Sequence, residues 1–578
     1  MKKHGFALST RRTIPEERGQ VVMSDEEPSK HHRSVWPFRE LGPRVSGALA
    51  GAVAGVLAAA LAGVLGAHAE HDHTSAQVAL AVFGVGVVGA WAALEARRLA
   101  TAETEEEAVD LLEKQQQQQQ QNEDMFDDEA NALQALRAGA EFAAILAVIY
   151  ACDRTTLARA GPKFRDAKAF WGVWCAVCAA ALVTVRRNKA VVLSRDQTEE
   201  WKGWMQIMFL LYHYFNQAEL YNAIRVYIAA YVWMTGYGNF LYYQKTGNFG
   251  LVRVAQTLFR LNFFVFFVCV LLRNEYMLYY ICPMHTVFTL FVWLALRFGQ
   301  SFLAFKLAAT FALTYVLYDT SFFQIAFGWQ PLRWLLAFHD PLHPEFSSDE
   351  LHEWQFRSGL DRYVWIFGAA CAAALPALQT LLEAVDRNER FFLRTALRFV
   401  LTAACAGAVA VWAVRVYALD KFAYNTLHPY TSWLPILAYV VLRNLLPLGR
   451  AFSLRLFGFL GKITLETYIL QFHVWMHSTG LNGSPKSLLV LLPDHFWLNF
   501  LLVSGIYLFL SLRVFDLTTR LKDTLLPTDA LVLARRTLKT AVLLFAFFVL
   551  VDSLWTSSLL LPRRSPPTTG DPELASPP

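Results

Sequence analysis

The apolar stretch from Trp201 to Tyr243 contains polar and ionisable side chains that could do chemistry inside a lipid bilayer. An ionisable group in hydrocarbon costs about 3 kcal/mol or more, so a membrane protein that carries one generally uses it. His213 follows Gln206 by two helical turns, and the two side chains therefore share one face. A neutral histidine can take a proton from a hydroxyl group, which makes His213 a candidate general base. The alternative is a hydrogen-bonded histidine of the core.

The segment that returns through the bilayer carries an arginine. Arg225 cannot lose its proton and needs an anion, a dense set of acceptors or a water-filled cavity. Asn222 precedes it by about one turn, and the stretch TGYGN, which ends at Asn239, predicts a weakened helix of the kind that lines cavities. We expect four side chains to position substrate or to stabilise an oxyanion: Gln206, Asn222, Arg225 and Asn239.

Two arginines lie at the start of the next apolar run. Arg253 and Arg260 share a helical face with Gln256. Arginine binds phosphates through paired N–H donors, so these arginines, together with Lys202, are candidates to bind phosphates that arrive from the cytosol. The alternative is an ordinary basic flank on the cytosolic side of a span, which suits Arg253 better than the deeper Arg260.

Two more histidines belong to the candidate catalytic set. His285 lies beside Pro283, near the expected luminal side. Glu466 and His473 are two turns apart on one helical face, so the carboxylate can orient or charge the imidazole as a second proton-handling pair. Pairing at a helix end is a comparable explanation. The candidate catalytic residues are thus His213, His285, Glu466 and His473.

The stretch HDPLHPEFSSDELHEWQFRSGLDRY predicts a polar loop in the lumen. Four of its side chains suit stacking on sugars and hydrogen bonding to them: Trp354, Arg357, Asp361 and Arg362. An interfacial aromatic belt would use the same residue types. No metal site is expected, because the histidine-rich loop HAEHDH lacks a partner cluster and all seven cysteines fall within apolar runs.

The elements that position these residues are membrane helices. The chain is 55% hydrophobic and only 17% charged, and apolar runs of about 20 residues recur along it, about 14 or 15 in all. We predict an all-α polytopic membrane protein. Its net charge of +5 lies mostly at span ends and does not indicate nucleic acid. Lysine and arginine are frequent before residue 45, which predicts a cytosolic N-terminus.

The chain divides into five predicted segments. These are a basic cytosolic tail (1–44), a transmembrane hairpin (45–98), an acidic, glutamine-rich cytosolic linker (99–131), a multi-span domain (132–561) and a disordered tail (562–578). One loop disagrees with this topology, because residues 153–166 are basic and yet are assigned to the lumen.

Seven blocks between about Asp196 and His473 resemble the signature blocks of the plant Reduced Wall Acetylation proteins. They read EWKGWMQIMFLLYHYF, YNAIRVYIAAYVWMTGYGNF, RLNFFV, YMLYYICPMHT, LHEWQFRSGLDRYVWI, YNTLHPYTSWLPI and GKITLETYILQFHVW. The same blocks are similar to the membrane domain of animal sialate O-acetyltransferase and of the fungal capsule O-acetylation protein. The order of polar residues resembles, more distantly, bacterial acyltransferase-3 enzymes, which implies a similar helical bundle.

The resemblance implies a multi-pass Golgi enzyme that moves acetyl groups from cytosolic acetyl-CoA to luminal glycans, here polysaccharides of the cell-wall type. It implies that His213 is the essential histidine and that Arg253 and Arg260 lie near the CoA phosphates. Sialate-type relatives carry a luminal domain with a nucleophilic serine, and no Gly-Asp-Ser block precedes the membrane part here. The final transfer is therefore expected in the membrane domain or on a separate luminal acetyltransferase. The alternative function is a translocator of acetyl groups or acetyl-CoA, and homodimerisation is left open.

Overall fold

The computed structural model describes residues 74–105, 119–297, 302–341, 344–346, 348–478 and 480–527, with scattered positions from 530 to 553. Helices make up most of this part of the chain, which confirms the predicted helical membrane fold. The predicted tails (1–44 and 562–578) lie outside the described residues. The prediction of an unstructured linker over 99–131 is wrong at both ends, where α2 runs to Glu105 and α3 begins at Gln119. Glutamine, glutamate and alanine, which are frequent there, are good helix formers.

Helices follow one another with short connections. The first part of the chain forms α2 (Ser75–Glu105), α3 (Gln119–Arg154), α4 (Ala167–Val183), α5 (Arg195–Tyr214), η3 (Ala218–Leu220), α6 (Tyr221–Thr246), α7 (Leu251–Leu272), η4 (Tyr276–Tyr279), α8 (Ile281–Arg297), α9 (Leu303–Asp319), α10 (Phe322–Phe327) and α11 (Gln330–Leu336). The second part forms η5 (Pro344–Phe346), α12 (His352–Leu360), α13 (Val364–Arg387), α14 (Phe391–Trp412), η6 (Ala413–Tyr417), α15 (Lys421–Thr431), α16 (Trp433–Leu445), α17 (Pro447–Ala451), α18 (Arg455–Leu460), α19 (Thr464–Leu470), η7 (Gln471–Trp475) and α20 (Phe496–Leu525).

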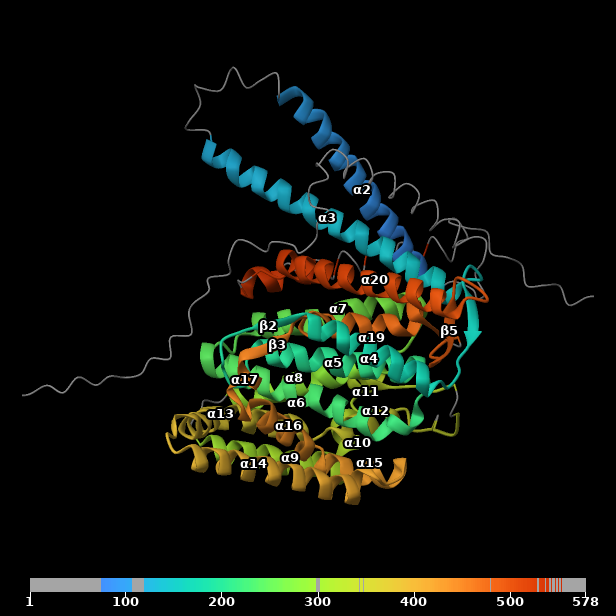
Figure 1. Cartoon of the computed structure of the whole chain (residues 1–578). Helices are drawn as coiled ribbons and strands as arrows, with labels where there is room; N and C mark the ends of the chain where they lie inside the picture. The colour runs from blue at the N-terminus through green and yellow to red at the C-terminus, as the bar shows by residue number, and fades with distance from the viewer. Residues whose placement is uncertain are drawn as a thin grey trace, which may run out of the picture. The chain divides into compact units, whose positions relative to one another are not determined.

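These helices stack in layers (Figure 1). Helices α5, α6 and α8 lie in the middle. Helices α20 and α7 lie on one side of them, and α9 and α14 lie on the other. Five helical segments of the described residues are long and apolar enough to cross a membrane: Leu133–Arg154, Leu251–Leu272, His352–Arg387, Phe391–Tyr417 and Phe496–Leu525. Four shorter helices are also apolar: Leu80–Ala92, Ala167–Val183, Ile281–Arg297 and Trp433–Leu445. Helices α5 and α6 are in neither set, because polar side chains interrupt their apolar sequence.

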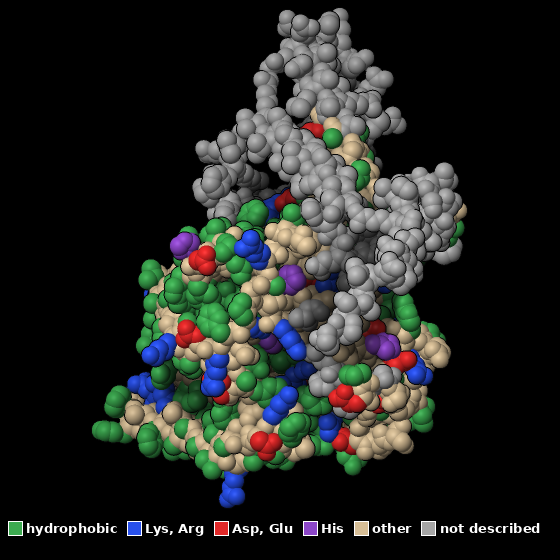
Figure 2. Space-filling model, turned by 90° about the vertical axis from the view of Figure 1, so that its right-hand side faces the viewer, with side chains coloured by type: hydrophobic (Ala, Val, Ile, Leu, Met, Phe, Trp, Pro, Cys, Tyr) green, Lys and Arg blue, Asp and Glu red, His purple; other side chains and the backbone are tan. Residues whose placement is uncertain are grey.

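The outer helices expose large apolar side chains. Phe305 of α9 and Phe392 and Phe399 of α14 are each more than 70% exposed, which a helix tolerates when its neighbour is lipid. Hydrophobic side chains also cover much of the flanks in Figure 2, and charged and histidine side chains are scattered over the part between them. The buried core lies around α5, α6 and α8.

Two small antiparallel sheets mark the two ends of the bundle (Figure 1). One has the strand order β1-β5-β4 and consists of β1 (Arg159–Pro162), β5 (Pro485–Val490) and β4 (Met476–Ser478). The other pairs β2 (Val185–Arg187) with β3 (Phe452–Leu454). We call these ends the β5 end and the β2 end. The predicted topology places the β5 end in the lumen and the β2 end in the cytosol.

Helix α6 is continuous through the stretch that was predicted to break it. A Cβ atom at Gly236 would lie 1.9 Å from the carbonyl oxygen of Trp365, and one at Gly368 would lie 2.1 Å from that of Trp233. These glycines therefore let α6 and α13 pack backbone against backbone, as small residues do in membrane proteins. The prediction was wrong because the glycine serves close packing and not a break in the helix.

Candidate active site

His213 lies in the last turn of α5, toward the β5 end. Ser194 caps the start of this helix by accepting a backbone N–H at 3.3 Å, and Asn216 ends it in a left-handed conformation with φ 49°. The imidazole packs edge-on against the rings of Phe209 and Tyr212, with centroids 4.7 and 4.9 Å away. It is half-buried and makes no hydrogen bond within the described residues. Its nitrogens are therefore available to a substrate.

Two cations lie within electrostatic reach of His213, namely Lys163 and Arg357. Lys163, in the loop between β1 and α4, donates to the carbonyl oxygen of Pro485 at 3.0 Å, and burial lowers its pKa to about 8. Arg357, in α12, binds Glu353 at 2.7 Å and stacks over the ring of Tyr280, 4.7 Å from its centroid. The surroundings of His213 are therefore electropositive and aromatic.

Arg225, in the first turns of α6, forms a buried ion pair. Its Nη2 lies 2.7 Å from Oδ2 of Asp361, and the two residues are 1% and 0% exposed. The other carboxylate oxygen faces Nε2 of His428 at 3.4 Å, and Nδ1 of His428 lies 2.9 Å from the hydroxyl of Tyr424. That hydroxyl lies 3.1 Å from a backbone carbonyl of α6. The short helix η3 joins the last turn of α5, which carries His213, to the first turns of α6, which carry Arg225, so the two residues lie at the same end of the bundle.

The other expected oxyanion donors are occupied within the protein. The amide N–H of Gln206 donates to the hydroxyl of Thr467 at 3.0 Å, and its oxygen accepts from Tyr231 at 3.2 Å. Asn222 donates to two backbone carbonyls at the end of η6, at 2.8 and 2.9 Å. Asn239 donates to a carbonyl one turn earlier in α6 at 2.9 Å. Of the four predicted residues, Arg225 alone keeps unpaired side-chain donors, Nε and Nη1, among the described residues.

Glu466 does not pair with His473, contrary to the expectation from their spacing. Its carboxylate is fully buried and lies 2.5 Å from Nη2 of Arg260, whose Nη1 donates to the hydroxyl of Thr518 at 2.9 Å. The helix changes from α19 to the π-helix η7 between Glu466 and His473, which alters the rotation per residue and removes the shared face. Arg260 is thus neutralised by a carboxylate.

The remaining basic residues expected near phosphates lie toward the β2 end. Lys202 binds Glu199, one turn earlier in α5, at 2.7 Å. Arg253 stacks over the ring of Tyr242, 4.3 Å from its centroid, and has no ion pair among the described residues. Of the three basic residues expected near phosphates, Arg253 is the one whose charge no carboxylate matches among the described residues.

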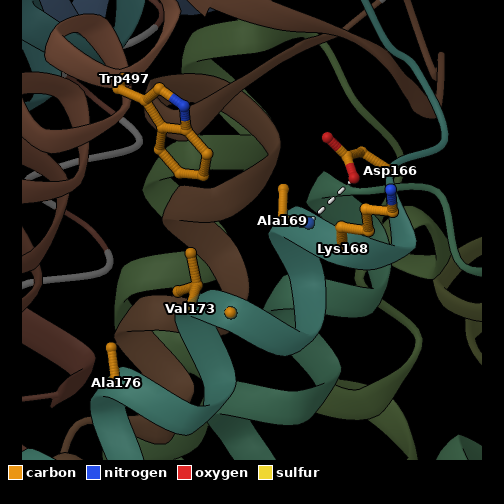
Figure 3. A pocket seen from close by; sticks show the side chains of 7 residues that line it. Asp166, Lys168, Ala169, Val173, Ala176 and Trp497 are labelled. Atoms are coloured by element: carbon orange, nitrogen blue, oxygen red, sulfur yellow. Dashed lines mark hydrogen bonds between the residues drawn. The ribbon is translucent and has the colours of Figure 1, made fainter.

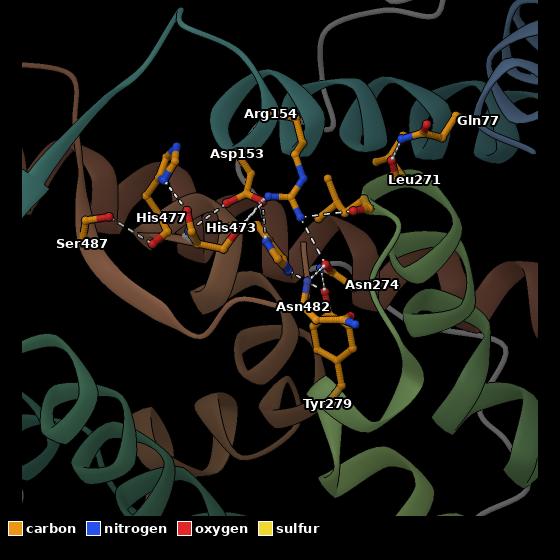
Figure 4. A network of polar contacts seen from close by, with 12 residues as sticks. Gln77, Asp153, Arg154, Leu271, Asn274, Tyr279, His473, His477, Asn482 and Ser487 are labelled. Atoms are coloured by element: carbon orange, nitrogen blue, oxygen red, sulfur yellow. Dashed lines mark hydrogen bonds and ion pairs between the residues drawn. The ribbon is translucent and has the colours of Figure 1, made fainter. Parts of the chain in front are cut away.

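His473 belongs to a closed network at the β5 end (Figure 4). Its Nε2 lies 2.6 Å from the hydroxyl of Tyr279, and its Nδ1 lies 3.1 Å from Oδ2 of Asp153. The carboxylate of Asp153 also accepts from the backbone N–H and hydroxyl of Ser478, at 2.9 and 2.8 Å, and pairs with Arg154 at 3.0 Å. Nε2 of His473 is thus hydrogen-bonded, while Nδ1 contacts Asp153 as an ion pair without hydrogen-bond geometry, and the network ties α3, η4 and η7 together.

Two of the four basic residues in the loop 153–166 are engaged within the protein: Arg154 belongs to the network, and Lys163 donates to a backbone carbonyl. Arg159 and Arg165 are exposed, and Arg165 lies 3.0 Å from Glu219 at the surface. The charge rule concerns charges that face water and lipid head groups, so this explains only part of the disagreement.

His285 lies in the first turns of α8. Its Nδ1 lies 2.7 Å from the hydroxyl of Thr235 in α6, which leaves the other ring nitrogen without a hydrogen-bond partner among the described residues. Thr235 is near the middle of α6, so His285 lies deeper in the bundle than the expected position near the luminal side.

The expected acceptor-binding residues separate into two groups. Trp354 is 0% exposed and packs against Phe327, and Asp361 is buried with Arg225. Arg362 binds Asp319 at 2.7 Å. Of the four, Arg357 is the one that acts electrostatically on His213. The other three are engaged within the protein: Trp354 packs in the core, and Asp361 and Arg362 form ion pairs.

A surface groove lies between α4 and α20 (Figure 3). It is lined by Asp166, Lys168, Val173, Ala176 and Trp497, among others, and Asp166 caps α4 by accepting a backbone N–H at 2.9 Å. No residue of the predicted site lines it. Within the described residues no group of histidine, cysteine, aspartate and glutamate side chains could hold a metal ion.

The sequence of this bundle identifies its class. Residues 67–538 match the family model described as the 10 TM Acyl Transferase domain found in Cas1p. The match covers most of the chain, so the protein is a multi-pass membrane protein that belongs to this acyltransferase family, as the resemblance predicted. No solved structure matches.

A curated relative is the N-acetylneuraminate (7)9-O-acetyltransferase of Danio rerio. It is 30% identical over 449 residues, which are 74% of this chain and 54% of the relative. The chain thus spans about half the length of this relative.

Three residues of the site were not singled out from the sequence. His428 and Tyr424 stand in the quoted block YNTLHPYTSWLPI, where a histidine within apolar sequence was the available signal. Lys163 stands in the basic loop that disagreed with the predicted topology. A single sequence does not show which distant polar residues meet, so these three could not be joined to His213 or Arg225.

Proposed function

We propose that the protein is a membrane O-acetyltransferase that moves the acetyl group of acetyl-CoA to hydroxyl groups of a glycan, with His213 as the base. The observation that carries this proposal is the half-buried imidazole of His213, which makes no hydrogen bond in the described part of the chain. It lies among aromatic and cationic side chains that suit sugar hydroxyls and an acyl thioester. The family and the activity named for the Danio rerio relative support the same reaction class.

The proposed step uses His213 twice. The acceptor hydroxyl gives its proton to the imidazole as its oxygen attacks the carbonyl carbon of the thioester. A tetrahedral intermediate forms, its oxyanion is stabilised by N–H donors, and the C–S bond then breaks. The imidazolium returns the proton to the departing CoA sulfur, so an ester and CoA are formed and His213 is unchanged.

The donor is proposed to enter from the β2 end. Arg253 is the candidate for the CoA phosphates, since it lies at the start of α7 and lacks a carboxylate partner among the described residues. Lys202 and Arg260 are held by Glu199 and Glu466, so their charges are already matched, and we propose that they contribute less to phosphate binding than Arg253.

The acceptor is proposed to reach His213 from the β5 end, past Arg357. If the β2 end faces the cytosol, this end faces a lumen, and we propose the Golgi as the compartment and a polysaccharide of the cell-wall type as the acceptor. The chain is proposed either to complete the transfer itself or to supply a separate luminal acetyltransferase.

A direct assay tests the reaction and the role of His213. Purified wild-type protein, His213→Ala and His495→Ala are each incubated with radiolabelled acetyl-CoA and a xylo-oligosaccharide. His495 is an exposed histidine beside α20 and serves as the control. We expect labelled ester from the wild type and from H495A. The rate of ester formation by H213A is expected to be lower by about 100-fold or more, because general acid–base catalysis accelerates such reactions by roughly 10²–10⁴.

The other outcomes are equally informative. Undiminished transfer by H213A would remove His213 from the chemistry. Label that crosses the membrane of a proteoliposome without forming an ester would favour the translocator. An acetyl-imidazole trapped on His213 by rapid acid quench would replace the base by an acyl carrier.

A further inference from the structure

Arg225 is only partly satisfied by the protein that surrounds it. The residue is 1% exposed, and its Nη2 is bound by Asp361, but Nε and Nη1 have no hydrogen-bond partner in the described part of the chain. A buried donor without an acceptor is costly, and a guanidinium cannot avoid that cost by losing its proton. An unpaired N–H group on a buried cation suits an oxygen that carries negative charge; Nε–H and Nη1–H point to different sides of the guanidinium, so one oxygen accepts from one of them.

A chain of three side chains holds this arginine in place. Asp361 contacts Arg225 with one oxygen and His428 with the other, at 2.7 and 3.4 Å. Tyr424 holds the far nitrogen of His428 at 2.9 Å. Asp361 and His428 are both 0% exposed, as is Tyr424. The three come from the end of α12 and from α15, so two elements outside α6 fix the orientation of one side chain on α6.

The 3.4 Å contact is long for a hydrogen bond, whereas the bond between His428 and Tyr424 has ordinary length. His428 is therefore anchored by Tyr424 through Nδ1. Its Nε2 side faces the carboxylate of Asp361 and limits the rotation of that group. With that rotation limited, Asp361 keeps Nη2 of Arg225 and leaves Nε–H and Nη1–H unpaired among the described residues. Arg225 lies in the first turns of α6, which the short helix η3 joins to the last turn of α5 with His213, so these donors lie at the same end of the bundle as the proposed base.

We propose that Asp361, His428 and Tyr424 are positioning residues that hold Arg225 so that one of its unpaired N–H groups points at the carbonyl oxygen of the acyl group. This inference rests on the proposed acetyl transfer. When the hydroxyl oxygen adds to the carbonyl carbon, the electron pair of the C=O bond moves to oxygen, and the N–H group that points at it stabilises that oxyanion. When the C–S bond breaks, the pair returns and this contact weakens. Arginine donates hydrogen bonds throughout and transfers no proton.

The test separates positioning from simple support of the fold. Asp361→Asn leaves Arg225 buried without a full counter-charge, so it lowers both Tm and kcat. In Arg225→Gln/Asp361→Asn neither charge remains, and Tm is expected to return toward that of the wild type. The kcat of this double variant is expected to stay about 100-fold or more below wild type, as for other lost oxyanion donors, with a smaller change in KM. His428→Gln is expected to lower kcat less and to change KM little.

The chain offers a matched control pair beside the site. Arg362 and Asp319 also lie 2.7 Å apart, but both are more exposed and neither contacts Arg225. Asp319→Asn is expected to keep kcat within about twofold of the wild type, because partly exposed pairs contribute little. All variants are measured in detergent with radiolabelled acetyl-CoA and a xylo-oligosaccharide, and Tm is followed by fluorescence.

Each result has a distinct meaning. An active wild type with a stable, inactive double variant supports the proposal. An active wild type whose double variant recovers kcat together with Tm would show that the pair only supports the fold, and the proposal would be wrong while the proposed function stands. A wild type that transfers no acetyl would overturn the proposed function and this inference with it.

Discussion

At the scale of single residues, the histidines of the bundle differ in whether their ring nitrogens are occupied. His473 faces Tyr279 and Asp153, and His428 faces Tyr424 and Asp361, on both sides of the ring. Such closed arrangements stabilise a buried histidine and leave it no free edge. His213 has no such partner in the described residues, which favours it as the base.

The two arginines of α7 differ in whether a carboxylate binds them, and this difference gives a prediction. Arg260→Ala leaves the fully buried Glu466 without its cation, so we expect a loss of about 3–5 kcal/mol in the free energy of unfolding. Arg253→Ala removes a cation that only stacks on Tyr242, and we expect its Tm to stay near wild type while KM for acetyl-CoA rises. Thermal unfolding in detergent and steady-state kinetics measure both effects. Equal Tm values for the two variants would contradict the structural role of Arg260.

At the scale of elements, close backbone contacts set the positions of the helices that carry the site. Gly236 and Gly368 bring α6 against α13, and Gly203 and Gly461 do the same for α5 and α18, where a Cβ atom would lie 1.8 and 1.9 Å from a carbonyl oxygen. Helix α5 carries His213, and α6 carries Arg225. The distance between these two functional side chains therefore depends on glycines far from them.

A matched pair of substitutions tests this packing. Gly236→Ala forces α6 away from α13, and we expect a loss of roughly 1–3 kcal/mol or more, together with reduced transfer activity. Gly238→Ala, two residues further along the same helix, meets nothing within 4 Å and is expected to be neutral or to stabilise the helix by about 0.5–1 kcal/mol. Unfolding curves and activity of the two variants are compared. A Gly236→Ala protein as stable as Gly238→Ala would refute the close approach.

At the scale of the whole molecule, the bundle has two different ends and an apolar outer surface. The β5 end carries the network of Asp153 and His473 and lies on the side of His213, and the β2 end carries Arg253. Exposed phenylalanines on α9 and α14 suit lipid and not water. A reaction with donor and acceptor on opposite sides of a membrane requires such a two-ended arrangement.

The orientation of the two ends can be measured. A glycosylation acceptor sequence inserted beside Asp494, in the loop before α20, is expected to receive a glycan in the secretory pathway. The same insertion beside Lys189, next to β2, is expected to remain unmodified. Mobility on a gel before and after glycosidase treatment reports the result. Glycan at the β2 end alone would invert the proposed topology.

The amino-acid sequence by itself determined the class of the protein and singled out candidate site residues. Apolar runs of membrane length and the family blocks predicted a helical multi-pass acyltransferase, and the cost of polar groups in hydrocarbon singled out His213 and Arg225. These inferences rest on local composition and spacing, which a single sequence displays directly. They hold whatever the helices pack against.

Only the tertiary structure decided which polar residues meet. Spacing predicted that Glu466 would pair with His473, whereas a π-helix turns them apart and places them with Arg260 and Asp153. His428 was joined to Asp361, 67 residues earlier, only by the docking of α15 on α12. The physical reason is that the partner of a buried charge is chosen by helix packing over long sequence separations, and a pattern along one helix does not contain that information.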